Sequence, residues 1–198
     1  MFKISFSLAL VSMLGFDALA NDFIQGKDKI IRNNTTIYLD KTSKYKSSYE
    51  SGILDKSIEA MKKAFFKNKM QTKGLAPDVS QVIILDVCSQ QFKNYTGYDC
   101  EYILDNQTIT GADHGGNPFF VITGVIGYGG SSTDSATYNG NQAVLLDIAG
   151  MDMNGDNIID GWQEIWDIST PYNDSGRFVY TARSINSGLS MSTWIQIQ

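Results

Sequence analysis

Residues 147–167 of this chain read DIAGMDMNGDNIIDGWQEIWD, and the rest of the sequence is best interpreted around them. Side chains that carry oxygen stand at the first, third, fifth and ninth positions of a loop within this stretch, namely Asp152, Asn154, Asp156 and Asp160. A short loop needs this spacing to surround a calcium ion with hard oxygen ligands. Three neighbouring carboxylates also repel one another unless a cation compensates them. The spacing therefore predicts a Ca²⁺ site.

Further ligands follow from position, because such a loop also takes a main-chain carbonyl from its seventh residue and a carboxylate from its twelfth. Ile158 is seventh, Gln163 is twelfth, and Glu164 follows one position later. Asn157 can adopt the positive φ that the sixth position requires, and Ile159 can anchor the loop to a core. The expected ligands are Asp152, Asn154, Asp156, the Ile158 carbonyl, Asp160, and Gln163 or Glu164.

The stretch from Asp152 to Glu164 resembles the calcium loops of EF-hand, dockerin and thrombospondin type 3 repeat proteins, especially the bacterial surface form DxDGDGxxDGWE. It departs from that pattern because Asn154 replaces an acid, Asn157 replaces a glycine, and the closing glutamate is displaced by one position. The resemblance implies one structural calcium ion. No second loop of this kind is visible in the chain, whereas dockerins and thrombospondin repeats carry tandem loops.

A metal-free alternative is a polar turn in which Asp160 caps a short helix at Gly161–Asp167, since Asp and Asn favour turns and helix N-caps. We predict that helix under either interpretation.

The first 20 residues have the features of a secretory signal peptide. Lys3 precedes an apolar run from Ile4 to Phe16, and Ala18 and Ala20 provide the small residues of a cleavage site. The mature chain is expected to begin at Asn21, and the apolar run is too short to span a bilayer. We therefore expect a periplasmic, cell-surface or extracellular protein that does not span the membrane after cleavage.

A pilin-like or pseudopilin-like subunit is one alternative. Gly15 and Phe16 could form a prepilin cleavage site, but the following residues lack the long apolar helix that pilins use to assemble. The resemblance is therefore limited to the globular part of such proteins, some of which bind calcium.

Residues 21–50 are polar and weakly patterned, with one short strand expected at Thr35–Leu39, and we predict an extended arm there. The folded domain is expected at residues 51–198. Apolar side chains recur every three or four positions between Ile53 and Met70, with lysines on the other face, which is typical of an amphipathic helix.

The remaining chain is rich in Val, Ile and aromatic residues bounded by Gly, Asn and Asp, a composition typical of β-strands. A length of 198 residues suits one domain. We predict an α+β fold in which one amphipathic helix packs on an antiparallel sheet, with the calcium loop near the C-terminal third. Strands are expected at Val79–Val87, Tyr98–Leu104, Pro118–Tyr128, Gln142–Ile148, Arg177–Arg183 and Ser192–Ile197.

Cys88 and Cys100 are the only cysteines, and they flank a short tract rich in turn residues. In an exported protein such a pair is expected to form a disulfide across a hairpin.

A secreted hydrolase with structural calcium is the second alternative. His114, the only histidine, stands beside Asp113 in a glycine-rich loop and would have to be its general base. No nucleophile motif accompanies this pair, so we expect a solvated loop histidine and assign no catalytic residue. Trp162, Trp166 and Trp194 could stack on a sugar, but the first two are better explained as anchors of the short helix.

Charge is unevenly distributed along the chain. Residues 21–75 hold 12 basic and 6 acidic side chains, whereas residues 76–198 hold 3 and 14. The acidic body argues against nucleic acid as a partner and suits a soluble cation-binding protein. We therefore expect an exported calcium-binding protein with a binding or structural role, whose partner is a protein or glycan at the cell surface.

Overall fold

The computed structural model describes residues 23–67, 77–129, 133–169 and 175–198. The predicted signal peptide lies outside these residues. Three helices and two antiparallel sheets make up the described part, so the α+β class is confirmed, although with more helices and strands than the sequence predicted. The helices are α2 (Lys46–Ser51), α3 (Asp55–Lys67) and α4 (Gln90–Thr96).

The larger sheet has seven strands in the order β1-β2-β8-β9-β5-β3-β4, and the smaller has four in the order β11-β10-β6-β7. Their bounds are β1 Asp28–Arg32, β2 Thr35–Leu39, β3 Gln81–Ser89, β4 Cys100–Tyr102, β5 Phe119–Ile126, β6 Ser135–Tyr138, β7 Asn141–Gln142, β8 Val144–Asp152, β9 Gly161–Asp167, β10 Gly176–Arg183 and β11 Ser190–Ile197.

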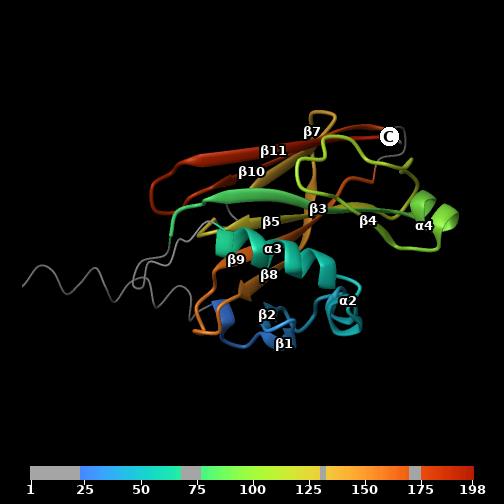
Figure 1. Cartoon of the computed structure of the whole chain (residues 1–198). Helices are drawn as coiled ribbons and strands as arrows, with labels where there is room; N and C mark the ends of the chain where they lie inside the picture. Colours follow the sequence, from blue (N-terminus) through green and yellow to red (C-terminus); the bar gives the residue numbers. More distant parts are fainter. Residues whose placement is uncertain (1–22, 68–76, 130–132, 170–174) are drawn as a thin grey trace, which may run out of the picture.

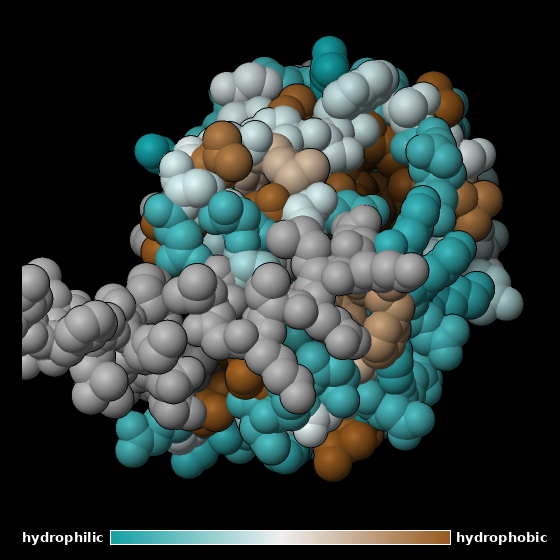
Figure 2. Space-filling model, turned by 60° about the vertical axis from the view of Figure 1, so that its left-hand side comes forward, coloured by the Kyte–Doolittle hydropathy of each residue, from teal (hydrophilic) through white to brown (hydrophobic). Residues whose placement is uncertain are grey.

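The molecule has three layers, with the seven-stranded sheet in the middle (Figure 1). One core lies between the two sheets and includes Val121 and Trp166 of the larger sheet and Phe178 and Ile195 of the smaller one. A second core lies on the other face of the larger sheet, where helices α2 and α3 cover it. On the outer surface, hydrophobic residues form separate patches among hydrophilic ones (Figure 2).

Helix α3 confirms the predicted amphipathic helix from Asp55 to Lys67. Ile58, Met61 and Phe65 recur at the expected spacing and are buried, which places one face of the helix on the larger sheet. No helix of the described residues is long and apolar enough to cross a membrane.

The predicted helix at Gly161–Asp167 is wrong, because these residues form β9. This strand lies in the middle of the larger sheet and pairs with β8 on one side and with β5 on the other. A helix of seven residues closes few internal hydrogen bonds and is marginal alone, whereas a central strand satisfies its backbone on both sides.

Residues 21–50, predicted as an extended arm, contribute β1, β2 and α2 to the fold. The strand expected at Thr35–Leu39 is β2, and it joins the larger sheet by pairing with β8. The predicted strands near β3, β4, β5, β8, β10 and β11 are also present, with their ends shifted by up to four residues.

Candidate functional site

The predicted calcium loop connects the end of β8 to the start of β9, two neighbouring inner strands of the larger sheet. Met151 and Gly161 form the last strand pair, and the Asp160 backbone amide donates to the Met151 carbonyl. The Asp160 carboxylate in turn accepts a hydrogen bond from the Met153 amide at 2.7 Å. Asp152 and Asp160 are thereby held at the two ends of the loop, where they are only 1% and 8% exposed.

The other oxygen-bearing side chains of the loop stabilise its turns. Asp152 accepts hydrogen bonds from the amides of Gly155 and Asn157 at 2.6 and 3.0 Å. Asn154 Oδ1 accepts a hydrogen bond from the Asp156 backbone amide, and Asp156 Oδ1 accepts one from the Ile158 backbone amide. Asn157 has the expected positive φ of 64°. Each accepting oxygen keeps a second lone pair that could coordinate a cation.

The centre of the loop brings together Asn154, Asp156 and Asp160. The Asn154 amide nitrogen lies 3.2 Å from an Asp156 oxygen and 3.4 Å from an Asp160 oxygen, so its N–H groups face both carboxylates. Burial raises the pKa of Asp160 to about 7, and the charges of Asp156 and Asp152 add to this rise. Burial and these two neighbouring carboxylates therefore both disfavour the charged form of Asp160.

Gln163 and Glu164 do not join this cluster. At roughly 3.3 Å per strand residue, they lie about 10 and 13 Å along β9 from Asp160. The Gln163 side chain accepts a hydrogen bond from the buried Tyr49 hydroxyl at 2.7 Å. Glu164 is fully buried, where burial and the charge of Asp134 raise its pKa to about 8. Within the described residues, no three or more His, Cys, Asp or Glu side chains are arranged as a preformed metal centre.

His114 is buried and not solvated, which corrects the expectation of a surface histidine. Its Nε2 lies 3.0 Å from a Glu101 oxygen and its Nδ1 lies 3.1 Å from Ser89 Oγ, while Asp113 beside it is exposed. The ring also stacks on Phe92 with centroids 5.0 Å apart. Burial lowers the pKa of His114, although the Glu101 carboxylate acts in the opposite direction.

Ser89, His114 and Glu101 form a hydrogen-bonded chain, the Ser-His-Glu row, which has a structural explanation. A neutral ring that donates from Nε2 to Glu101 can accept the Ser89 hydroxyl proton at Nδ1, and Ser89 Oγ also accepts the Phe92 amide as the N-cap of α4. All three side chains are then satisfied. Sequence reasoning missed Ser89 and Glu101, although a serine just before a helix is a recognisable N-cap.

The three tryptophans do not form a common platform. Trp162 and Trp166 are core residues of β9, 8% and 2% exposed, and Trp166 donates to the Thr123 hydroxyl. Trp194 is 41% exposed on β11, with the Arg177 guanidinium 4.1 Å from its ring centroid. Cys88 and Cys100 are paired across β3 and β4 in the predicted disulfide.

Comparison with protein families matched residues 69–197 to the model described as Domain of unknown function (DUF4879). The chain belongs to this family. No curated protein and no solved structure matched the chain.

The DUF4879 match includes the β8–β9 loop, the disulfide and the His114 row, but it begins after the described part of α3. The β1–β2 hairpin and α2 precede it, although β2 lies beside β8 in the same sheet.

Proposed function

We propose that this DUF4879 protein is an exported calcium-binding protein with a structural or binding role, and that the β8–β9 loop holds the ion. The proposal depends on the burial of Asp152 and Asp160 in a loop where no described lysine or arginine forms an ion pair with either carboxylate. Buried carboxylates are costly unless an opposite charge compensates them. A divalent cation would supply that charge.

Binding requires one local change. The Asn154 amide must turn so that its oxygen, and not its NH₂ group, faces Asp156 and Asp160. The donors are then Asp152, Asn154, Asp156, Asp160 and the carbonyl of Ile158, and water completes the six to eight oxygens that Ca²⁺ takes. With no bidentate closing carboxylate, the expected dissociation constant is on the order of 10⁻⁴ to 10⁻³ M, typical of extracellular sites.

Export is supported by the predicted signal peptide and by the disulfide, which is typical of oxidising compartments. In that setting the ion would tie together the ends of β8 and β9, and the partner would be a protein or glycan outside the cell.

The test compares two variants that each remove one exposed carboxylate. Asp156→Asn changes the loop, whereas Asp105→Asn makes the same change outside it. Calcium at about 100 times its dissociation constant should stabilise the wild type and Asp105→Asn by roughly 2.7 kcal/mol. Asp156→Asn should lose most of this gain while folding normally in chelator. Thermal melting measures the stabilisation by calcium, and calorimetry measures the binding of calcium. Equal melting temperatures of the wild type in calcium and in chelator, with no heat of binding, would show that the loop is only an acidic turn.

A further inference from the structure

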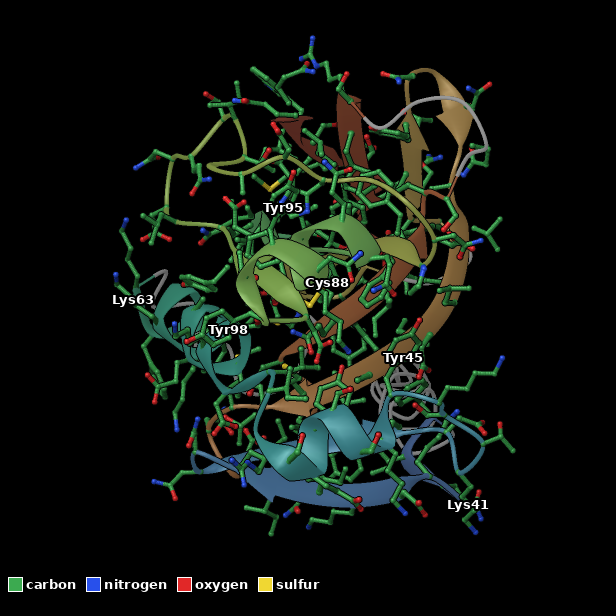
Figure 3. The ribbon with its side chains drawn as sticks, turned by 90° about the vertical axis from the view of Figure 1, so that its right-hand side faces the viewer. Lys41, Tyr45, Lys63, Cys88, Tyr95 and Tyr98 are labelled. Atoms are coloured by element: carbon green, nitrogen blue, oxygen red, sulfur yellow. A yellow bond between two sulfur atoms is a disulfide. The ribbon has the colours of Figure 1, made fainter. Side chains whose placement is uncertain are left out.

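A pocket of about 150 Å³ opens between α2, α4 and the ends of β3, β4 and β5. Figure 3 faces this side of the molecule, with Tyr45 beside one end of α2 and Cys88 close to α4. The pocket lies at the α2 and α4 end of the molecule, whereas the β8–β9 loop is the orange turn at the lower left of Figure 1. The two sites can therefore be tested separately.

The inner wall of the pocket is apolar. It is formed by Leu54, Phe120 and Ile122, together with Cys100 of the disulfide. Leu54 and Ile122 are almost completely buried, and the Tyr45 ring stands edge-on to Phe120 with centroids 5.7 Å apart. An apolar cavity of about 150 Å³ in another protein binds a single benzene ring. This pocket has the size and lining for one such ring, and its two aromatic side chains can make edge or offset contacts with it.

The mouth of the pocket is polar but carries no excess charge. Lys93 and Asp99 form an ion pair of 2.6 Å there, so each neutralises the other. Ser48 also lines the pocket, and its hydroxyl makes no hydrogen bond with the described residues. A neutral hydrogen-bonding group on the ligand suits this mouth better than a charged one.

Ser89 lines the same pocket, but its side chain does not face it. Successive side chains of a strand point to opposite faces, and Cys88 lies in the core beneath the helices. Ser89 Oγ points to the opposite face, where it contacts His114. The pocket is therefore a binding site separate from the Ser-His-Glu row.

We propose that this pocket binds one phenol-type ring, with the ring against Phe120 and Ile122 and the hydroxyl group at the mouth beside Ser48. The ring could belong to a free small phenol or to a tyrosine side chain of a peptide. Both share the same chemistry, and the experiment distinguishes them.

The probes are p-cresol, N-acetyl-tyrosinamide and 4-methylcyclohexanol, each titrated into the ¹⁵N-labelled full chain in chelator and followed by amide chemical shifts. Binding of p-cresol should shift amides of α2, α4 and β5. Binding of p-cresol alone would identify a free phenol as the ligand, and binding of N-acetyl-tyrosinamide as well would extend the site to peptides. Equal affinity for 4-methylcyclohexanol would overturn the aromatic preference.

Ser48→Phe should fill the pocket and weaken p-cresol binding by at least about tenfold, or 1.4 kcal/mol. Ser47→Phe is the matched control, because Ser47 is the exposed neighbour on the same helix and does not line the pocket. The affinity of the Ser47→Phe variant for p-cresol should stay within about twofold of that of the wild type. The proposal is overturned by equal affinities of the two variants. If Ser48→Phe does not fold, the shift map of the wild type decides, since perturbations away from α2 and α4, or none up to the solubility limit, contradict the site.

Discussion

Asp86 shows how one residue of the larger sheet acquires properties that its neighbours in sequence do not imply. A β-bulge interrupts β3 between Ile84 and Asp86, and the Asp86 carboxylate lies in the core, 5% exposed, where the Ser57 hydroxyl of α3 donates to it. Burial raises the pKa of Asp86 to about 7, although the Ser57 hydrogen bond opposes the rise. The folded protein therefore favours the protonated carboxyl.

This burial predicts a pH-dependent stability. The unfolded chain releases the Asp86 proton near pH 4, whereas the folded chain retains it until about pH 7. The free energy of unfolding should fall as the pH rises through this window, with up to about 1.4 kcal/mol per pH unit from this group, and level off above it. Asp86→Asn should remove this part of the slope in urea denaturation between pH 4 and 8. Asp105→Asn is the exposed control, and identical slopes for the wild type and Asp86→Asn would contradict the prediction.

At the scale of elements, the β1–β2 hairpin depends on a two-residue turn. Arg32 pairs with Thr35, and the intervening Asn33 and Asn34 have φ values of 50° and 56°. A turn with two positive φ values matches the twist of the strands that it joins. Lys62 of α3 donates to both turn carbonyls, which links the hairpin to the helix. Two consecutive asparagines are a sequence signal for this hairpin that the expectation of an extended arm overlooked.

Replacing Asn34 by alanine should therefore destabilise the protein by about 1 kcal/mol, because asparagine adopts the left-handed region more readily than alanine, whose side chain cannot form the local hydrogen bonds that favour it. Asn34→Gly should be neutral or slightly stabilising, since glycine adopts this conformation without strain. Both variants lack the Asn34 side-chain amide, but only glycine adopts the turn conformation without strain. Comparing their stabilities in urea denaturation therefore separates the effect of the backbone conformation from the effect of losing that amide. Equal loss in both variants would show that the backbone conformation of the turn is not what matters.

Strand β9 is the element that sequence reasoning misjudged. Its seven residues follow the predicted calcium loop and were expected to form a short helix, but β5 and β8 pair with them on both sides. The same pairing separates Gln163 and Glu164 from the loop. Their position depends on strands that are distant in sequence, so no local pattern could have shown it.

At the scale of the whole molecule, the Cys88–Cys100 disulfide joins β3 to the edge strand β4 of the larger sheet. Closing a loop of this length, with the cysteines 12 residues apart, is expected to contribute about 3 kcal/mol through the unfolded chain. Wild-type protein with the disulfide reduced should be destabilised by about this amount in urea denaturation. The oxidised and reduced forms have the same sequence and differ only in the state of these two cysteines. A reduced form of unchanged stability would show that strand pairing alone holds this edge.

Features that depend on near neighbours in the chain could be predicted from the order of residues. The spacing of apolar residues specified helix α3, the composition of the strands specified most of the larger sheet, and the alternation of Asp and Asn brought Asp152, Asn154, Asp156 and Asp160 into one loop. These features rely on backbone geometry over a few residues, which the order of residues encodes directly.

Features that depend on distant partners became visible in the three-dimensional fold. It placed His114 between Ser89 and Glu101, buried Asp86 beneath Ser57, and enclosed the pocket between α2 and α4. Each environment combines segments brought together by strand pairing and core packing. The free energy of a buried group depends on those neighbours and on the exclusion of water, and neither is a property of the local sequence.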